Sequence, residues 1–278
     1  MTEIGPTSIV VGIDGSEPSL RAATFARSYA DLHSLELFGA VVATDSLGLG
    51  HDDAIEPAVR DSLMTKVRAS LVEAGITLDE ISVGVGHPAT ALTELASPAA
   101  ALVVGARGIG GFSALLLGST TSACLSLARC PVMVIPAQRN APITPQGRIC
   151  VGVDGSAGSI AALKWALHEA TTRLGCEVYA IAAWRAPHLW EPIQGGPAHY
   201  EERAQRDLHA AVQAAGETPV ALTSETKEGN AAAVLIDASS TSDFVVLGND
   251  RREGGRFDGG ATPVAVASHS HCPVVIVP

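Results

Sequence analysis

Runs of apolar, mostly β-branched residues alternate with segments of helical spacing along the first half of the chain. The apolar runs predict strands over residues 8–13, 36–43, 81–85, 101–104 and 132–135. Apolar residues at helical spacing predict helices over residues 19–32, 57–74, 89–96 and 119–128. Near-continuous apolar strands separated by helices are typical of a parallel sheet that is buried on both faces, so the pattern predicts an α/β fold.

The second half of the chain repeats this layout. The segment IVVGIDGS at residues 9–16 returns as ICVGVDGS at residues 149–156. Strands are expected over residues 149–153, 177–183, 220–223, 244–247 and 274–277, with helices over residues 159–174, 200–215, 231–239 and 264–268. A repeat of this length indicates a duplicated domain rather than a solenoid unit. We therefore expect two domains, residues 1–137 and 147–278, joined by a segment that contains proline and glycine.

Composition and charge narrow the class of protein. Apolar residues make up 47% of the chain, which is typical of a packed globular protein, and the net charge is −11. An acidic chain without a basic cluster argues against a nucleic-acid partner. No apolar run is long enough to cross a membrane, and the first residues do not resemble a secretion signal. The five cysteines, an odd number in apolar settings, are interpreted as buried thiols in a reducing cytoplasm.

Candidate chemistry follows two of the expected strands in the first half. Asp14 comes after the first strand, and the loop Gly105-Ala106-Arg107-Gly108 comes after the fourth, followed by Gly118-Ser119 after nine intervening residues. A glycine-rich loop between a strand and a helix start turns backbone N–H groups toward a phosphate. If the strand order is 3-2-1-4-5, these strands are neighbours and both segments face the crevice where ligands bind in open sheets.

Each residue of this candidate site has an expected role. Arg107 is the only cation in the loop between Gly105 and Ser119. Asp14 carries the same charge as a phosphate, so we expect it to hold a ribose hydroxyl, a base amine or the water shell of Mg²⁺. The backbone at Val41, near the end of the second strand, is placed to flank a flat base.

Structural interpretations compete with these roles. Asp-Gly-Ser after a strand is also an Asx turn that leads into a helix cap, and glycines after strands are often only turns. The chain has no Walker-type lysine, no nucleophile elbow and no evident base to activate water, so we expect no catalytic residues and at most slow hydrolysis of a bound nucleotide. The segment His269-Ser270-His271-Cys272 is too small a cluster for a metal site, and no metal is expected.

Several motifs together resemble the universal stress protein family, here in tandem. They are VGIDGS at residues 11–16, GHPA at residues 86–89, the spacing Gly105-x2-Gly108-x9-Gly118-Ser119, and CPV at residues 130–132. The resemblance implies two open-twisted parallel five-stranded sheets of order 3-2-1-4-5, with helices on both faces, in the adenine nucleotide alpha hydrolase-like fold. It implies a cytoplasmic, nucleotide-dependent regulator of stress responses that acts on an unidentified protein partner. It also implies dimerisation through the last strand, either as a homodimer or by pairing of the two halves of this chain.

The same resemblance implies an ATP site, with or without Mg²⁺. Its residues would be Asp14, the backbone of Val41, Gly105, Gly108, Gly118, Ser119 and Thr120. The second half departs from this pattern, because Arg251 stands where the first half has Gly108 and acidic residues surround it. We therefore expect one ATP per chain, in the first domain. The alternative is a structural or interaction module of the same fold that binds no nucleotide; ATP-dependent adenylating and flavin-binding enzymes are less favoured because their signature loops are missing.

Overall fold

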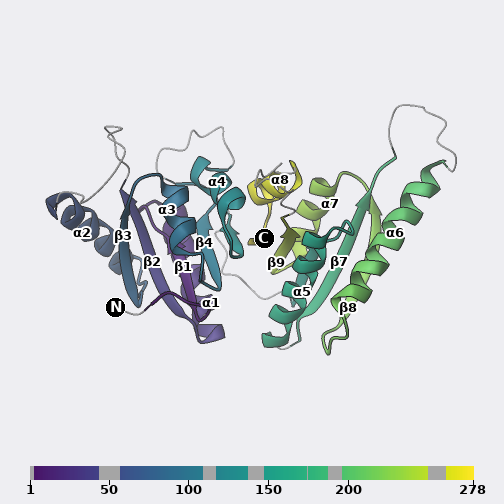
Figure 1. Cartoon of the computed structure of the whole chain (residues 1–278), viewed down its shortest axis with the longest axis horizontal. Coiled ribbons are helices and arrows are strands. Elements are labelled where there is room, and N and C mark those ends of the chain that lie inside the picture. The colour runs from purple at the N-terminus through teal and green to yellow at the C-terminus, as the bar shows by residue number, and fades with distance from the viewer. Residues whose placement is uncertain are drawn as a thin grey trace. The chain divides into compact units, whose positions relative to one another are not determined.

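Two compact units make up the chain, Met1–Ala137 and Gln138–Pro278 (Figure 1). The computed structural model describes residues 3–43, 57–108, 117–136, 147–173, 175–186, 196–249 and 261–278. Each unit alternates strands and helices, so each is described separately below.

The first unit contains five strands and four helices among its described residues. They are β1 (Ser8–Gly12), α1 (Glu17–His33), β2 (Glu36–Ala43), α2 (Pro57–Glu73), β3 (Glu80–Val85), α3 (Pro88–Leu95), β4 (Ala101–Gly105), α4 (Ser119–Leu127) and β5 (Val132–Ile135). The strands are parallel and lie in the order β3-β2-β1-β4-β5, which confirms the expected order.

Helices cover both faces of this sheet (Figure 1). A methyl group placed on Gly12 would meet Leu92 of α3, whereas one placed on Gly105 would meet Pro18 of α1. The central strands β1 and β4 are therefore buried on both sides, and every residue of β4 is buried. This burial explains why they read as continuous apolar runs rather than as alternating ones.

The second unit repeats this architecture. Its elements are β6 (Arg148–Gly152), α5 (Ala157–Thr172), β7 (Glu177–Trp184), α6 (Gly196–Ala215), β8 (Leu222–Glu228), α7 (Ala231–Ala238), the short 3-10 helix Ser239–Thr241, β9 (Phe244–Gly248), α8 (Ala261–His269) and β10 (Val274–Val277). The parallel order is β8-β7-β6-β9-β10, equivalent to that of the first unit. Helices α5 and α6 pack on one face of the sheet, and α7 packs on the other.

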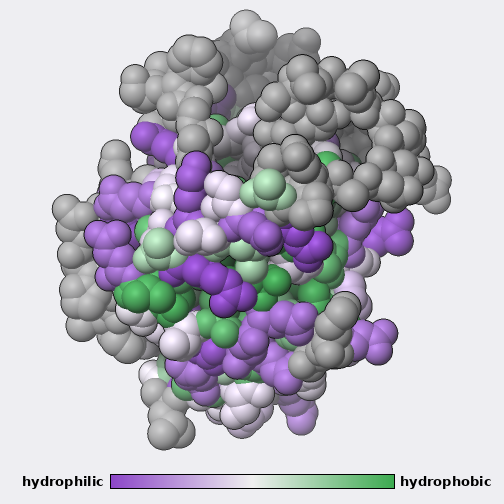
Figure 2. All heavy atoms as spheres, turned by 90° about the vertical axis from the view of Figure 1, so that its left-hand side faces the viewer, coloured by the Kyte–Doolittle hydropathy of each residue, from purple (hydrophilic) through white to green (hydrophobic). Residues whose placement is uncertain are grey.

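The outer strands of the two sheets differ in composition. In β8 the edge carries Glu225, Lys227 and Glu228, and most of its side chains are exposed or half-buried. In β3 the only charged residue is Glu80, and Val85 at the strand end is 54% exposed. On the side of the first unit seen in Figure 2, hydrophobic residues show between hydrophilic ones.

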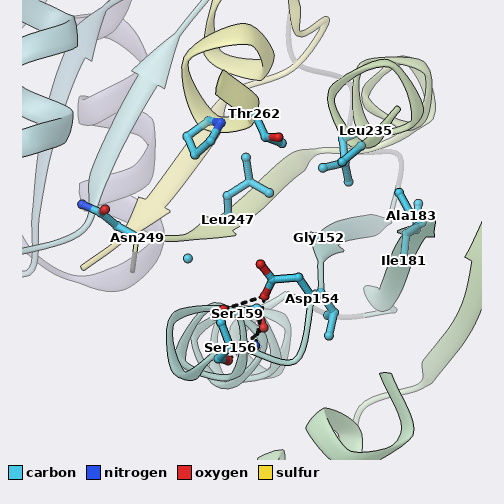
Figure 3. A pocket seen from close by; sticks show the side chains of 14 residues that line it. Gly152, Asp154, Ser156, Ser159, Ile181, Ala183, Leu235, Leu247, Asn249 and Thr262 are labelled. Atoms are coloured by element: carbon cyan, nitrogen blue, oxygen red, sulfur yellow. Dashed lines mark hydrogen bonds between the residues drawn. The ribbon is translucent and has the colours of Figure 1, made fainter. Parts of the chain in front are cut away.

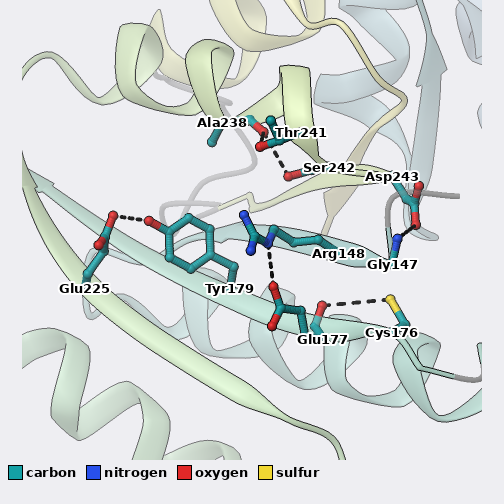
Figure 4. A network of polar contacts seen from close by, with 10 residues as sticks. All are labelled: Gly147, Arg148, Cys176, Glu177, Tyr179, Glu225, Ala238, Thr241, Ser242 and Asp243. Carbon is teal, nitrogen blue, oxygen red and sulfur yellow. Dashed lines mark hydrogen bonds and ion pairs between the residues drawn. The ribbon is translucent and has the colours of Figure 1, made fainter.

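A polar network connects β8 to its neighbour β7 and, through β7, to β6 (Figure 4). Arg148 Nε donates to Glu177 Oε1 over 2.6 Å, and the Arg148 guanidinium lies 5.2 Å from the centre of the Tyr179 ring. The Tyr179 hydroxyl donates to Glu225, whose Oε1 also pairs with Lys227 Nζ at 2.9 Å. These bonds are made within the sheet, so we assign the network a structural role.

Candidate functional site

The carboxyl ends of β1 and β4 lie side by side in the first sheet, where the strand order reverses. Such a reversal point is where ligands bind in open α/β sheets. Asp14 follows β1, and the chain from Gly105 to Gly108 follows β4. The residues singled out in the sequence therefore come to one edge of the sheet.

Asp14 occupies a tight turn that starts helix α1. Its Oδ1 atom accepts hydrogen bonds from the Ser16 N–H at 2.9 Å and from the Ser16 hydroxyl at 2.6 Å. The Ser16 Oγ atom in turn accepts the Ser19 N–H at 3.3 Å, which caps the helix. Gly15 permits the turn with a φ of 81°. The Oδ1 atom of Asp14 is therefore engaged in the turn that begins α1.

The other carboxylate oxygen of Asp14 is directed toward the glycine loop. A methyl group on Gly108 would lie 2.4 Å from Asp14 Oδ2, so these two residues are immediate neighbours and a larger residue at position 108 would displace the Asp14 carboxylate. The Gly118 N–H donates to the Ala106 carbonyl at 2.8 Å, which brings the far end of the loop back to its start. Asp14, Gly108 and Gly118 therefore meet, although residues 109–116 lie outside the described part of the chain.

Gly105 has a packing role that the sequence did not reveal. A methyl group there would lie 2.8 Å from the Pro18 carbonyl oxygen, so β4 approaches the start of α1 too closely for a side chain. The Gly105 carbonyl accepts the buried hydroxyl of Thr121 at 2.8 Å. The sequence analysis did not identify Thr121 as a residue that holds the loop in place. The only signal for it was its position in the first turn of α4, directly after the loop.

Helix α4 begins at Ser119, and Gly118 is its N-cap, with φ −70° and ψ 150°. Ser119 is therefore the first residue of the helix rather than its cap. Gly118 supplies no side-chain oxygen to the N-terminal N–H groups, so the first turn, which includes the exposed Ser119 and the half-buried Thr120, keeps the donor capacity of a helix start. Arg107 is half-buried directly before Gly108.

Val41 has a buried side chain, 2% exposed, and pairs with Val83 of β3. Only its backbone is available to a ligand. Strand β1 leaves the ladder after the pair Gly12–Ala40, so Val41 is the next residue of β2 beyond that last pair. This placement is compatible with the role expected for its backbone.

In the second unit, Asp154 occupies the same turn as Asp14. Its Oδ1 atom accepts the Ser156 N–H at 3.0 Å and the Ser156 hydroxyl at 2.5 Å, and Ser156 caps α5 by accepting the Ser159 N–H at 3.1 Å. Partial burial opposes the charge of Asp154, but these hydrogen bonds outweigh it, so the pKa of Asp154 lies below its ordinary value. The carboxylate is ionised at neutral pH.

A cavity of about 240 Å³ opens beside Asp154 at the carboxyl ends of β6 and β9 (Figure 3). Its walls come from β7 (Ile181 and Ala183), α7 (Leu235) and β9 (Leu247). A second hollow of about 230 Å³ lies on the β7–α6 side and shares Val153, Asp154 and Ala183 with the first. The expected substitution of Arg251 for a loop glycine lies outside the described residues, as do the neighbouring acidic positions.

The described ranges contain no group of three or more histidine, cysteine, aspartate or glutamate residues placed to hold a metal ion. His269 and His271 are exposed, whereas Cys272 is buried, so the segment does not present its side chains together. No helix among the described residues is long and apolar enough to cross a membrane.

Comparisons with known proteins match both units to one family. A sequence model described as the universal stress protein family matches residues 6–136 and 146–278. Two similar relatives from Mycobacterium tuberculosis are Universal stress protein MT2052, 27% identical over 300 residues, and Universal stress protein Rv2623, 27% identical over 286 residues. These alignments cover 96% of this chain and 94% and 95% of the respective relatives.

Solved structures give the same fold. A universal stress protein from Archaeoglobus fulgidus aligns with a TM-score of 0.68 at 18% identity, covering 98% of this chain and 96% of its own. A putative universal stress protein from Pseudomonas aeruginosa aligns with a TM-score of 0.58 at 17% identity, covering 98% of this chain and 93% of its own. At these identities the likeness supports the fold alone.

Proposed function

The chain belongs to the universal stress protein family, and from this premise we propose that its first unit binds ATP and that the protein acts as a nucleotide-dependent regulator of a stress response. The observation that carries the proposal is the meeting of Asp14 Oδ2 with Gly108 at the carboxyl ends of β1 and β4. A carboxylate and a side-chain-free loop beside a helix start provide separate places for a sugar and for phosphates.

Each residue has a distinct part in this proposal. The backbone N–H group at Gly108 and the first turn of α4, with Ser119 and Thr120, would hold the phosphates, and Arg107 would add the positive charge. The Gly118 N–H is bonded to the Ala106 carbonyl, so Gly118 would contribute by leaving the space beside the phosphates free of a side chain. Asp14 would accept the ribose hydroxyls through Oδ2, which is the oxygen that adjoins Gly108. The backbone of Val41 would flank the adenine, and Gly105 would act indirectly, by letting β4 pack against Pro18.

The proposed chemistry is retention of the nucleotide rather than its turnover. Among the described atoms nearest to Gly105, Gly108 and Gly118, the only carboxylate is that of Asp14, whose Oδ1 atom is held by the α1 cap. Bound ATP, with or without Mg²⁺, would place negative charge at this edge of the sheet. The charged edge would present a different surface to a partner protein than the empty site, which is how binding would regulate.

A second candidate function rests on the folding roles found in the same residues. Asp14 helps to start α1, and Gly105 is required by packing against Pro18, so both would be present in a module that binds no nucleotide. In this alternative the chain acts only through its surfaces.

Titration calorimetry with ATP, in the presence and absence of Mg²⁺, distinguishes the two. Gly118→Ala is the decisive variant, because a methyl group there meets ordinary contacts of 3.5 Å and the backbone φ of −70° suits any residue. The variant should fold, but its added methyl group should occupy space in which we expect the ATP phosphates to lie. We expect one ATP per chain, lost in Gly118→Ala and unchanged in the matched second-unit variant Asp154→Asn.

Saturation at 100 times Kd should also stabilise the protein by about 2.7 kcal/mol, which a thermal shift detects. Two equal ATP sites would contradict the assignment to the first unit. Absence of both heat and thermal shift at millimolar ATP would favour the module that binds no nucleotide.

A further inference from the structure

Thr121 makes a hydrogen bond that crosses from a helix to a strand of the first unit. Its side chain is buried, and its hydroxyl donates to the Gly105 carbonyl over 2.8 Å, from the first turn of α4 to the last residue of β4. The buried Thr93 of α3, by contrast, donates to the Ala89 carbonyl of its own helix. A hydroxyl in the first turn has no complete turn of helix before it, so Thr121 bonds the strand instead.

Two hydrogen bonds connect the end of β4 to the start of α4. The Gly118 N–H donates to the Ala106 carbonyl at 2.8 Å, and the Thr121 hydroxyl bonds the residue before Ala106. The first bond holds the N-cap of α4 and the second holds the helix three residues further on, so together they fix both the place and the direction of the first turn. A methyl group on Gly118 would lie 3.5 Å from Arg107 Cα and 3.8 Å from Gly108 N, so α4 starts directly beside the loop.

The direction of this turn decides what its backbone offers to an anion. The N-cap Gly118 supplies no side-chain oxygen, so the N–H groups of the first turn are not occupied by a side-chain cap. The attraction of a helix start for an anion falls off within one turn, and hydrogen bonds weaken steeply as they bend, so a small rotation of α4 would weaken several contacts to a phosphate. A bond that holds the turn in place beforehand lowers the cost of ordering it on binding.

The second unit has a natural counterpart that lacks this hydroxyl. Helix α8 has the same length as α4, and the same number of residues separates each helix from the strand that follows it. In this alignment Pro263 stands at the position of Thr121, and proline has no hydroxyl to donate. The second unit reaches the same strand order without the bond, so the fold does not require it.

We propose that Thr121 is a positioning residue for the phosphates of ATP. Its hydroxyl fixes the first turn of α4 against β4, so that the N–H groups of the turn already face the space beside Gly108 when the nucleotide arrives. This role rests on the proposed ATP site and adds to it a buried residue that acts through the helix rather than by contact with the nucleotide.

Titration calorimetry of the full chain with ATP tests this role. Thr121→Val keeps the shape of the side chain but removes the hydroxyl, and it should raise the Kd for ATP about tenfold. Thr121→Ser loses the methyl group but keeps the hydroxyl, and it should bind ATP as the unchanged chain does. Thr121→Ala removes the same hydroxyl with a smaller side chain and should also raise the Kd, so the test does not depend on how well valine fits.

The matched control is Thr93→Val, the same replacement at a buried threonine elsewhere in the first unit. Both valine variants lose a buried hydrogen bond, so both should lower the melting temperature of the nucleotide-free chain, but only Thr121→Val should change the Kd for ATP.

Three results would overturn the inference and leave the proposed ATP site in place. They are an unchanged Kd in both Thr121→Val and Thr121→Ala, an equal rise of the Kd in Thr93→Val, and a Thr121→Ser chain that binds as weakly as Thr121→Val. Absence of ATP binding by the unchanged chain would instead contradict the proposed function itself, so the two failures are distinguishable.

Discussion

Replacing Gly248 with alanine should destabilise the second unit severely. The new methyl group would lie 2.1 Å from the backbone carbon of Gly158, 2.2 Å from its oxygen and 2.5 Å from the Ser159 nitrogen. Restoring a contact of about 3.5 Å requires the start of α5 to move by roughly 1.4 Å away from β9. Overpacking of a core costs about 1–3 kcal/mol, and a clash of backbone with backbone belongs at the upper end, about 3 kcal/mol.

Such a loss is a large part of the total stability of a domain, which is about 5–15 kcal/mol. The melting temperature of the second unit should fall by about 10 °C. Trp165, Trp184 and Trp190 are the three tryptophans of the chain, and all belong to the second half of the sequence. Urea denaturation followed by tryptophan fluorescence therefore reports the second unit selectively.

Two further glycine variants serve as controls. Gly105→Ala, with its closest atom at 2.8 Å, should cost less, about 1–2 kcal/mol, and should affect circular dichroism but not the fluorescence transition. Gly84→Ala meets only Ala91 Cβ at 3.7 Å and should be neutral. A Gly248→Ala protein that loses less than about 1 kcal/mol, or no more than Gly84→Ala, would refute the packing explanation for these strand-end glycines.

Three other outcomes are expected. Ser156→Ala removes the cap of α5 and should lower the stability of the second unit by about 1 kcal/mol, measured by the same fluorescence assay. The Asp79 carboxylate accepts the Leu37 N–H at 2.7 Å, and this bond lowers the pKa of Asp79 from its ordinary value of 3.8. The resulting stabilisation is present above pH 3.8 and is lost as the pH falls through the lower pKa of the folded state. Asp79→Asn should therefore make the free energy of unfolding depend less on pH in the acid range. Burial raises the pKa of the Cys124 and Cys150 thiols to about 12, so iodoacetamide at pH 8 should label them only in denaturant; labelling of the native chain would contradict their burial.

The central strands could be predicted from the sequence because burial on both faces leaves only apolar residues. The expected strand over residues 244–247 is the structure's β9, one residue longer. The edge strand was predicted poorly: residues 220–223 were expected, whereas β8 spans Leu222–Glu228. An edge strand faces solvent, so its polar sequence carries no hydrophobic signal.

The candidate site was predictable in its location but not in its details. Repeated motifs at strand ends placed Asp14 beside the glycine loop, and Asp14 Oδ2 indeed adjoins Gly108. The packing of Gly105 against Pro18 joins residues 87 positions apart, which no local pattern reveals. The cavity beside Asp154 escaped notice for a related reason, since Ile181 and Leu235 look like ordinary core residues until the fold brings them together.

The difference in charge between the outer strands β3 and β8 affects how the protein aggregates on heating or at high concentration. A free sheet edge offers unpaired backbone groups to any extended segment that reaches it, and charged side chains discourage that pairing. β8 has three such charges along its second half, whereas β3 has one and ends on the exposed Val85. Aggregation should therefore start at the first unit, which holds the glycine loop, and because the two units share one chain it would remove both from solution.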